Sequence, residues 1–307
     1  MTIRQLEIFT AIVETGRFTT AAQKMYVAQP SVSQQIRLLE EELGERLFVR
    51  LKNRKVHLTE AGRLLHAHAE AILRQCQVAR MEIAALTKEP TGQIRIGIGG
   101  HQLTSMLPPA LSAFHGKYPK ICVDVMNGTS PQIIELLKTN RLDLGIVNFP
   151  IQARELRAEV LFTEELVLVL RKANNAAMRR IVDAAQIAEL PLILYDQSTS
   201  TRKRLDAFFR QFKITPRITF ELSSVEGMKS MVRAGLGATI IPYSAVLLDS
   251  HDDLCVQRLR GKPLTRSVGA AMPNPSNMPL VMETMLLLIK QRFREIENLL
   301  SAVNRKK

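Results

Sequence analysis

The apolar positions between residues 21 and 48 predict two helices joined by a tight turn. The first, short helix has an apolar side made of Ala21, Ala22 and Met25. Pro30 is tolerated at the start of the second helix, because the first amides of a helix have no partner within it. The second helix has one apolar face with spacings of four, three and four, which is a helical period. That face consists of Val32, Ile36, Leu39 and Leu43.

The polar side of the second helix is crowded with Gln, Ser and Arg near its start. This arrangement is typical of a helix-turn-helix that reads DNA, since such side chains can hydrogen-bond base edges and phosphates in a major groove. The alternative is an ordinary helical hairpin with a solvated face. The predicted reading edge consists of Gln29, Pro30, Ser31, Ser33, Gln34 and Arg37.

The flanking segments favour the DNA-binding interpretation. Leu6, Phe9 and Val13 repeat at helical spacing and predict a helix that packs behind the pair. Residues 50–57, RLKNRKVH, hold four basic residues and no acid, which predicts a small basic hairpin, or wing, beside the reading helix. Lys and Arg in a wing would bind DNA phosphates and release counterions. The predicted wing contacts are Arg50, Lys52 and Arg54.

Residues 1–60 resemble the winged helix-turn-helix of the LysR-type transcriptional regulators. The resemblance is carried by LEIFTAIVETGRFTTAAQKMYVAQPSVSQQIRLLEEELGERLFVR and by VHLTEAG, and the spacing between these blocks also fits. It extends more weakly over the rest of the chain. It implies a transcription factor that binds double-stranded DNA and a small-molecule effector. It also implies a homo-oligomer, with a dimer of dimers favoured over a dimer.

A long helix is predicted from about Thr59 to Leu86. Thr59 can cap it, with Glu60 in its first turn. Its apolar residues step by a mean of 3.5, which is the period of a coiled-coil seam. The seam consists of Leu65, Ala69, Ile72, Cys76, Ala79, Ile83 and Leu86.

This helix is expected to form a dimer, because paired winged helices need a two-fold partner to read two half-sites. The alternative is a helix packed against its own chain. The segment TKEPTG, residues 87–92, then ends the helix and predicts a hinge, since Pro and Gly together stop regular structure.

From residue 93 the pattern alternates between strands and helices, in an order β-α-β-α-β that occurs twice. Strands are expected at 94–99, 121–126, 142–147, 165–170, 191–195, 217–222 and 238–241, and helices at 108–118, 131–139, 201–212, 225–235 and 280–300. Repeated units of this kind predict two parallel-sheet lobes with right-handed crossovers. The two lobes resemble periplasmic-binding-protein modules, which LysR-type regulators carry as an effector domain.

The predicted fold class is therefore α/β with an all-α winged helix-turn-helix N-terminal domain, a long dimerisation helix and a two-lobed periplasmic-binding-protein-like effector domain. The expected boundaries are 1–58 for the DNA-binding domain, 59–88 for the linker helix and 89–307 for the effector domain. Lobe I is expected at about 91–163 and 268–304, and lobe II at about 164–267.

Small polar residues gather where the predicted strands end and the next helices begin. Ligands of open α/β sheets bind at such places. Hydroxyls and amides at several helix starts suit an anion, and Arg202 could add positive charge, so a small carboxylate or inorganic oxyanion effector is predicted. The candidate contacts are Gly100, His101, Gln102, Thr104, Thr129, Ser130, Asn148, Thr201 and Arg202.

Simple helix capping is the alternative reason for hydroxyls at these positions, and for any one loop it is the safer interpretation. For Thr129 and Thr201 together ligand contact is favoured, and the resemblance to the family implies effector-binding hydroxyls in such a loop. His101 is expected to have a structural role and not a catalytic one.

Composition adds a few constraints. The net charge of +13 suggests a polyanionic partner, but residues 1–58 hold nine Lys and Arg against six Asp and Glu, so most of the excess lies elsewhere. Three distant cysteines without ligand spacing predict buried free thiols, with a disulfide switch as the alternative, and neither a metal nor a cofactor is expected. The chain shows no apolar leader and no long apolar run, which predicts a cytoplasmic protein without a membrane partner.

The motifs of common enzymes are missing from the sequence, which holds no GxSxG, P-loop, HExxH or GxGxxG pattern. An enzyme is therefore not expected. Two other classes stay open as alternatives, an enzyme with a fused helix-turn-helix and a ligand-independent architectural DNA binder. Two α/β lobes are more than an architectural protein needs.

Overall fold

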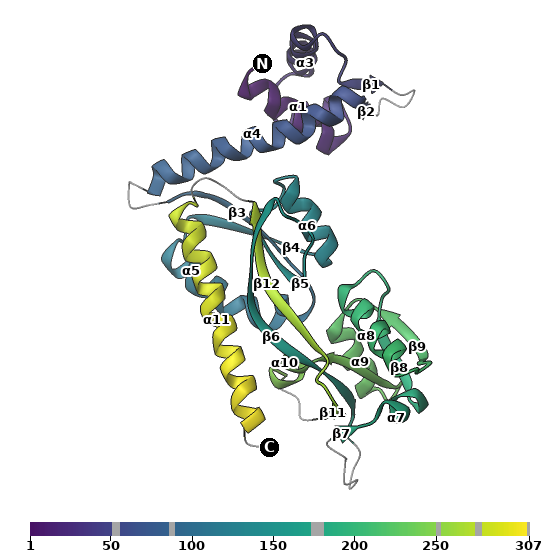
Figure 1. The fold of residues 1–307 in the computed structure, drawn as a ribbon. Helices are drawn as coiled ribbons and strands as arrows, with labels where there is room; N and C mark the ends of the chain where they lie inside the picture. Colours follow the sequence, from purple (N-terminus) through teal and green to yellow (C-terminus); the bar gives the residue numbers. More distant parts are fainter. Residues whose placement is uncertain (51–55, 86–89, 173–180, 250–252, 274–277, 306–307) are drawn as a thin grey trace. The chain divides into compact units, whose positions relative to one another are not determined.

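The computed structural model describes residues 1–50, 56–85, 90–172, 181–249, 253–273 and 278–305. The chain folds into two compact units, the first made by residues 1–88 and the second by most of residues 89–307 (Figure 1). The first unit is mainly helical, and the second is α/β. The elements of the first unit are α1 (Ile3–Thr15), α2 (Phe18–Lys24), α3 (Gln29–Leu43), β1 (Phe48–Arg50), β2 (Val56–Leu58) and α4 (Glu60–Ala85).

The core of the first unit joins α1, α3 and the hairpin β1–β2. Phe9 is fully buried, and its ring centroid lies 5.2 Å from that of Phe48. The predicted face of α3 is buried as far as Leu39. Leu43 is 41% exposed, because the helix ends there and Gly44 turns the chain away in a left-handed conformation with φ of +71°.

The start of α4 is fixed by the predicted cap. The hydroxyl of Thr59 accepts a hydrogen bond of 2.9 Å from the amide of Gly62 and donates one of 2.6 Å to the carbonyl of Arg46. A Cβ atom at Gly62 would lie 2.2 Å from the carbonyl oxygen of Leu47, so a larger residue could not stand there without moving the chain. The turn before α4 therefore depends on both residues.

The predicted seam of α4 divides into two parts. Leu65, Ala69 and Ile72 pack against the core of their own unit, as the alternative interpretation of this helix held. Further along, Ile83 is 65% exposed. Only the later residues of the seam therefore remain available for a partner helix. Leu86 lies outside the described residues.

The second unit is built on one long mixed sheet, with strand order β4-β3-β5-β12-β6-β10-β8-β9. The strands β3, β4 and β5 are parallel in one half, and β8, β9 and β10 are parallel in the other. The β-α-β-α-β order is therefore present in both halves, as predicted. The strands are β3 (Gly92–Ile98), β4 (Ile121–Asn127), β5 (Leu144–Phe149), β6 (Leu156–Arg171), β7 (Ile181–Val182), β8 (Pro191–Tyr195), β9 (Arg217–Leu222), β10 (Ala238–Pro242), β11 (Leu254–Leu259) and β12 (Thr265–Pro273).

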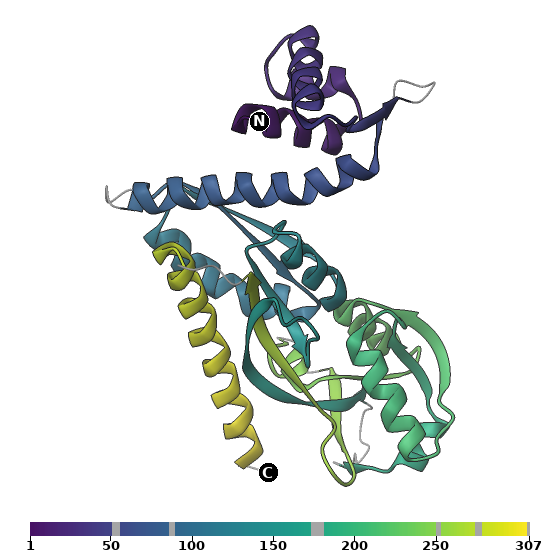
Figure 2. The same ribbon diagram turned by 45° about the horizontal axis from the view of Figure 1, so that its top comes forward.

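Two long antiparallel strands connect the two halves of the sheet, as Figures 1 and 2 show. The strand β6 pairs with β12 in the first half and then with β10 and β11 in the second. Of β6, the sequence pattern predicted only residues 165–170 as a strand. It predicted no strand at the position of β12. The first part of β6, LRAEVLFTEE, mixes charged residues with apolar ones and so lacks a continuous apolar run.

Helices cover both halves of the sheet. They are η1 (Gln102–Met106), α5 (Leu107–Lys117), α6 (Ser130–Lys138), α7 (Ala184–Glu189), α8 (Ser200–Gln211), α9 (Val225–Arg233), α10 (Tyr243–Leu247) and α11 (Leu280–Arg305). The long α11 packs along α5, next to the first half of the sheet, as expected (Figure 2). It is not covered on every side, since Leu287 is 63% exposed.

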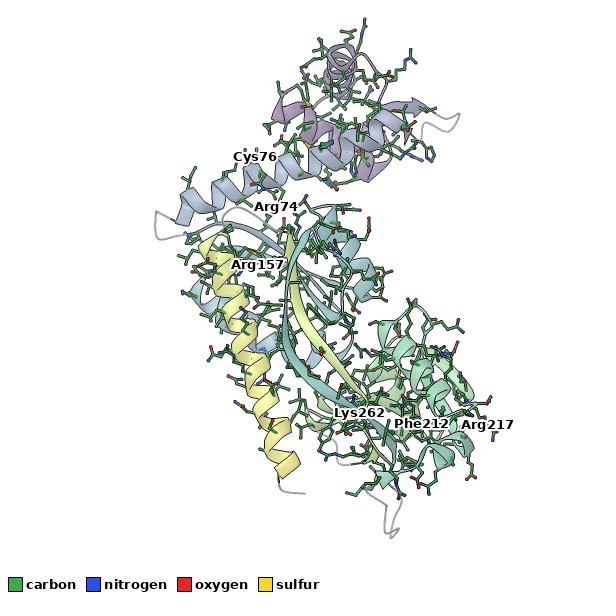
Figure 3. The ribbon with its side chains drawn as sticks, viewed as in Figure 1. Arg74, Cys76, Arg157, Phe212, Arg217 and Lys262 are labelled. Carbon is green, nitrogen blue, oxygen red and sulfur yellow. The ribbon has the colours of Figure 1, made fainter. Side chains whose placement is uncertain are left out.

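Two further expectations can be compared with the structure. The predicted hinge begins in residues 87–89, which lie outside the described residues, and Pro90 and Thr91 then lead into β3. Within the described part of the chain the three cysteines form no disulfide. They are not buried as expected, because Cys122 is exposed on the edge strand β4, and Cys255 and Cys76 (Figure 3) are half-buried.

Candidate functional site

The residues of the predicted reading edge occupy the exposed side of α3 and its first turn. Gln29, Pro30, Ser31, Gln34 and Arg37 are exposed, and Ser33 is half-buried. The side chain of Gln29 donates a hydrogen bond of 2.8 Å to the hydroxyl of Ser33. The edge is thus available to a partner along the N-terminal half of the helix.

The charge along α3 is not uniform. Its C-terminal half carries Glu40, Glu41 and Glu42, of which Glu41 pairs with Arg37 at 2.7 Å and Glu40 accepts from the amide of Leu47 at 2.7 Å. DNA phosphates repel these carboxylates, whereas amides and hydroxyls at the N-terminal half can approach base edges. The charge distribution therefore favours DNA contact through the first turns of α3.

The predicted wing is present as an antiparallel hairpin. Phe48 pairs with Leu58 and Arg50 pairs with Val56, so the hairpin begins at the core residue Phe48. Lys52 and Arg54 fall in the connection between the two strands and lie outside the described residues.

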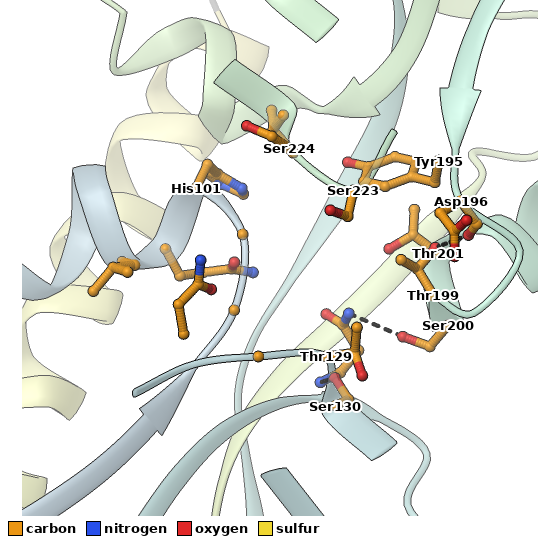
Figure 4. Close-up of a pocket in the computed structure, with 18 of the residues that line it drawn as sticks. His101, Thr129, Ser130, Tyr195, Asp196, Thr199, Ser200, Thr201, Ser223 and Ser224 are labelled. Carbon is orange, nitrogen blue, oxygen red and sulfur yellow. Dashed lines mark hydrogen bonds between the residues drawn. The ribbon is translucent and has the colours of Figure 1, made fainter. Parts of the chain in front are cut away.

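In the second unit, a pocket of about 710 Å³ lies between the two halves of the sheet. Its volume is in the range of small-molecule sites. Figure 4 shows residues from both halves around it. Eight of the nine predicted effector contacts line it, namely Gly100, His101, Gln102, Thr104, Thr129, Ser130, Asn148 and Thr201.

The pocket lies where several helices begin. Thr129 and Ser130 stand at the start of α6, Thr199 and Ser200 at the start of α8, and Ser224 caps α9. The first amides of a helix have no partner within it, and the helix dipole makes such ends weakly positive. Several helix starts facing one cavity therefore favour a negatively charged ligand.

Close backbone approach shapes the same end of the sheet. A Cβ atom at Gly99 would lie 2.5 Å from the carbonyl oxygen of Gly128, and Gly100 has a left-handed φ of +63°. These glycines let the loop after β3 fold over the loop after β4. The side chains that follow, His101 and Gln102, are thereby brought to the pocket.

Arg202 does not line the pocket, contrary to the expectation for it. Its guanidinium donates to Glu221 and to the carboxylate of Asp206, the latter at 2.9 Å, and also to the carbonyl of Tyr195 at 2.7 Å. Its side chain is 6% exposed. On α8, a residue next to Thr201 in sequence points to a different side of the helix, so Arg202 cannot follow Thr201 into the cavity.

The positive group at the pocket is Arg266 on β12, which sequence analysis missed. Its Nε and Nη2 atoms donate to Oε1 of Glu164 at 2.9 and 2.8 Å, and its Nη1 atom lies 3.5 Å from the hydroxyl of Thr201. With its amide oriented to satisfy both neighbours, Gln102 accepts from Nη2 of Arg266 at 2.9 Å and donates to the carbonyl of Gly99. Arg266 therefore holds two pocket residues in place.

Glu164 extends this network towards His101. Its Oε2 atom accepts from both the amide and the hydroxyl of Ser244, and that hydroxyl lies 2.7 Å from Nε2 of His101. All three side chains are buried. Burial, together with the charges of Arg266 and Lys229, holds the pKa of His101 well below its usual value, so its imidazole is neutral.

Two carboxylates also line the pocket, and each has a partner. Hydrogen bonds from the hydroxyl of Ser198 and then from its amide, the latter at 2.9 Å, lower the pKa of Asp196. Glu226 pairs with Lys229 at 2.9 Å. Within the part of the chain that the structure describes, no group of three or more His, Cys, Asp and Glu is placed to hold a metal ion, and no helix has the length and apolar character needed to cross a bilayer.

A winged helix-turn-helix with an open reading edge, followed by a two-lobed α/β unit with a pocket, defines a DNA-binding regulator with a small-molecule-binding domain. Residues 3–63 match the bacterial regulatory helix-turn-helix proteins of the lysR family, and residues 87–294 match the LysR substrate binding domain. The chain belongs to the LysR family of DNA-binding transcriptional regulators. The prediction of the family and of the fold class is confirmed.

Characterised relatives cover most of the chain. The nitrogen assimilation regulatory protein nac of Escherichia coli is 31% identical over 80% of this chain and 79% of that protein. The HTH-type transcriptional activator CmpR of Synechocystis is 28% identical over 93% of each. The solved structure of full-length CbnR complexed with its target DNA has a TM-score of 0.68 at 21% identity, covering 95% of this chain and 100% of that chain, and so shares the fold.

Proposed function

We propose that this regulator binds a small anionic effector, a carboxylate or an inorganic oxyanion, in the pocket between its two lobes and changes its binding to an operator in response. The observation that carries the proposal is the convergence of the starts of α6, α8 and α9 on one cavity of about 710 Å³. Helix starts favour negative charge. The proposed contacts are Gly100, His101, Gln102, Thr104, Thr129, Ser130, Asn148 and Thr201.

On the DNA side, the proposed reading edge is Gln29, Pro30, Ser31, Ser33, Gln34 and Arg37, and the proposed phosphate contacts are Arg50, Lys52 and Arg54. The proposal assigns residues 1–58 to DNA binding, 59–88 to dimerisation and 89–307 to the effector, in a homo-oligomer that is a dimer of dimers. The exposed Ile83 supports a partner helix along the later part of α4. The proposed place of action is the cytoplasm, because the helix-turn-helix matches a family of bacterial regulatory proteins.

The effector proposal is tested by removing one hydroxyl from each lobe. Thr129→Val and Thr201→Val nearly keep the side-chain volume, and both should abolish the change in operator affinity that anions cause in the unaltered protein. The measurement is fluorescence anisotropy of a labelled operator, titrated with and without a panel of small carboxylates and oxyanions. The affinity of each variant without effector serves as its reference.

Thr219→Val is the matched control, since Thr219 lies on β9 and does not line the pocket. It should respond to anions as the unaltered protein does. A normal response by both pocket variants would refute the proposed site. Failure of every anion to alter operator binding would refute the anionic effector.

A further inference from the structure

Three buried polar atoms at the pocket lack a hydrogen-bond partner among the described residues. They are Nδ1 of His101, Oδ1 of Asn148 and the phenolic oxygen of Tyr195. His101 is 1% exposed and Tyr195 is 4% exposed. Buried polar groups are nearly always hydrogen-bonded, so unpartnered atoms on residues that line one cavity indicate groups that a ligand completes. Figure 4 shows the side chains of His101 and Tyr195 at this cavity.

The hydrogen-bond network fixes which ring nitrogen of His101 carries the proton. Glu164 is ion-paired with Arg266, so its carboxylate can only accept hydrogen bonds. The single hydroxyl proton of Ser244 is therefore donated to Glu164, and the hydroxyl oxygen is left to accept. The partner at 2.7 Å from that oxygen, Nε2 of His101, must then be the donor.

It follows that Nδ1 of His101 is an acceptor. A neutral imidazole has one N–H donor and one acceptor nitrogen, and the lowered pKa of His101 keeps the ring neutral. A bare anion such as sulfate or acetate has no proton to donate to this nitrogen. An anion that is bound only by the helix starts would therefore leave Nδ1 of His101 without a hydrogen-bond donor.

The charges around His101 select between the two common kinds of donor. Arg266 and Lys229 both act on the ring electrostatically, in the direction that disfavours a further positive charge. A ligand ammonium group at Nδ1 would meet the same repulsion. A hydroxyl group donates without adding charge, so it fits this position better than an amine.

We infer that the effector is a small hydroxylated organic anion, whose hydroxyl group donates a hydrogen bond to Nδ1 of His101. This inference rests on the proposed function, since it assigns a second feature to the same ligand. Figure 4 shows His101 on the opposite side of the cavity from Thr129, Ser130 and Ser200. The hydroxyl and the anionic group therefore stand at different ends of the ligand.

Matched ligand pairs that differ by one hydroxyl test the inference. Malate with succinate, and 3-hydroxybutyrate with butyrate, are titrated calorimetrically into the full-length protein. Leaving a buried acceptor without a donor weakens binding by roughly tenfold, so the hydroxylated member of at least one pair should bind about tenfold more tightly. A site that only attracts charge would bind both members of each pair equally.

The variant His101→Gln separates the acceptor from the structural contact. A glutamine amide can still donate to Ser244 from a position like that of Nε2, but it places no acceptor where Nδ1 stands. The hydroxyl preference, which is the ratio of the two affinities measured in the same protein, should fall to about twofold or less. His115→Gln on the exposed end of α5 is the matched control and should keep the full preference.

The tautomer can be tested without a ligand. In protein labelled with ¹⁵N at histidine, the resonances that vanish in His101→Gln should show a neutral ring with Nε2 protonated and Nδ1 bare near pH 7. A ring protonated on Nδ1, or a charged ring, would overturn the inference whatever the ligand. Equal binding of both members of every pair would overturn it while leaving the anionic effector intact. Failure of every anion to bind would overturn the proposed function and the inference together.

Discussion

Replacing Glu164 with Gln would leave the guanidinium of Arg266 buried without its charge partner. The two side chains are 0% and 4% exposed, and two hydrogen bonds of 2.8 and 2.9 Å join them. Breaking a buried pair by removing one charge costs about 3–5 kcal/mol, because the remaining charge is not solvated. The free energy of unfolding of the second unit should therefore fall by about 3 kcal/mol, near the low end, since the amide oxygen of Gln can still accept from Arg266.

Removing both charges should lower the free energy of unfolding less than removing one of them. Glu164→Leu combined with Arg266→Met replaces the pair with apolar side chains in a buried place, and such exchanges are often neutral. The double variant should regain most of the stability that Glu164→Gln loses. It should still lose effector binding, because Gln102 and Thr201 would no longer be held by Arg266.

The assay is urea unfolding followed by circular dichroism, since the chain contains no tryptophan for fluorescence. For a domain of this size, 1 kcal/mol corresponds to about 2–4 °C in Tm, so thermal unfolding should show a drop of roughly 6–12 °C. Glu295→Gln is the control, because its partner Arg292 lies one turn away on the surface of α11 and such pairs contribute about 0.5 kcal/mol or less. If Glu164→Gln costs no more than this control, the buried pair is not structurally important and the reasoning fails.

Three further outcomes are expected. Gln34→Ala should weaken binding to the specific operator by roughly 1–3 kcal/mol and to random DNA much less; equal losses in anisotropy titrations would argue for a phosphate contact instead. Arg50→Ala should weaken binding to all sequences alike and reduce the salt slope by about one; a changed sequence preference at constant slope would exclude the wing role. Ile83→Glu should give smaller species in sedimentation, while Ile72→Glu should lower the stability of the first unit, because Ile72 packs on its own core; an unchanged mass for Ile83→Glu would exclude α4 as the dimer contact.

The elements that sequence predicted best are those with strong local signals. These signals act within one helical turn or one hairpin. They are the apolar period of α3, the cap at Thr59 and the basic residues before Val56. The packing partner of the α4 seam was harder to predict, because an apolar period of about 3.5 residues fits both a partner helix and the core of the same unit. Leu65 and Ile72 satisfy both the seam and the core of the first unit, and only the folded chain separates the two uses.

The candidate site was predicted as far as helix starts could reveal it. Thr129 and Thr201 both line the pocket, since each stands at the carboxyl side of a strand. Arg202 does not line the pocket, because its guanidinium is paired with Asp206 and Glu221. Arg266 was missed because it lies on β12, whose sequence TRSVGAAMP is made mostly of small and polar residues and so gave no sign of a strand or of an approach to Thr201.

Hydrogen bonds between protein groups tie the two lobes together across the pocket. The side-chain amide of Asn148 donates to the hydroxyl of Ser200 at 3.0 Å, and Arg204 donates to the carbonyl of Phe149. An effector can act only through a different affinity for alternative arrangements of the lobes. A ligand that contacts Thr129 on one side and His101 on the other, and can make both contacts in only one arrangement of the lobes, binds that arrangement more tightly. A tenfold loss of the ligand's preference for one arrangement removes about 1.4 kcal/mol from the free energy that couples effector binding to DNA binding. The ligand hydroxyl that donates to His101 is therefore expected to decide which anions are effectors.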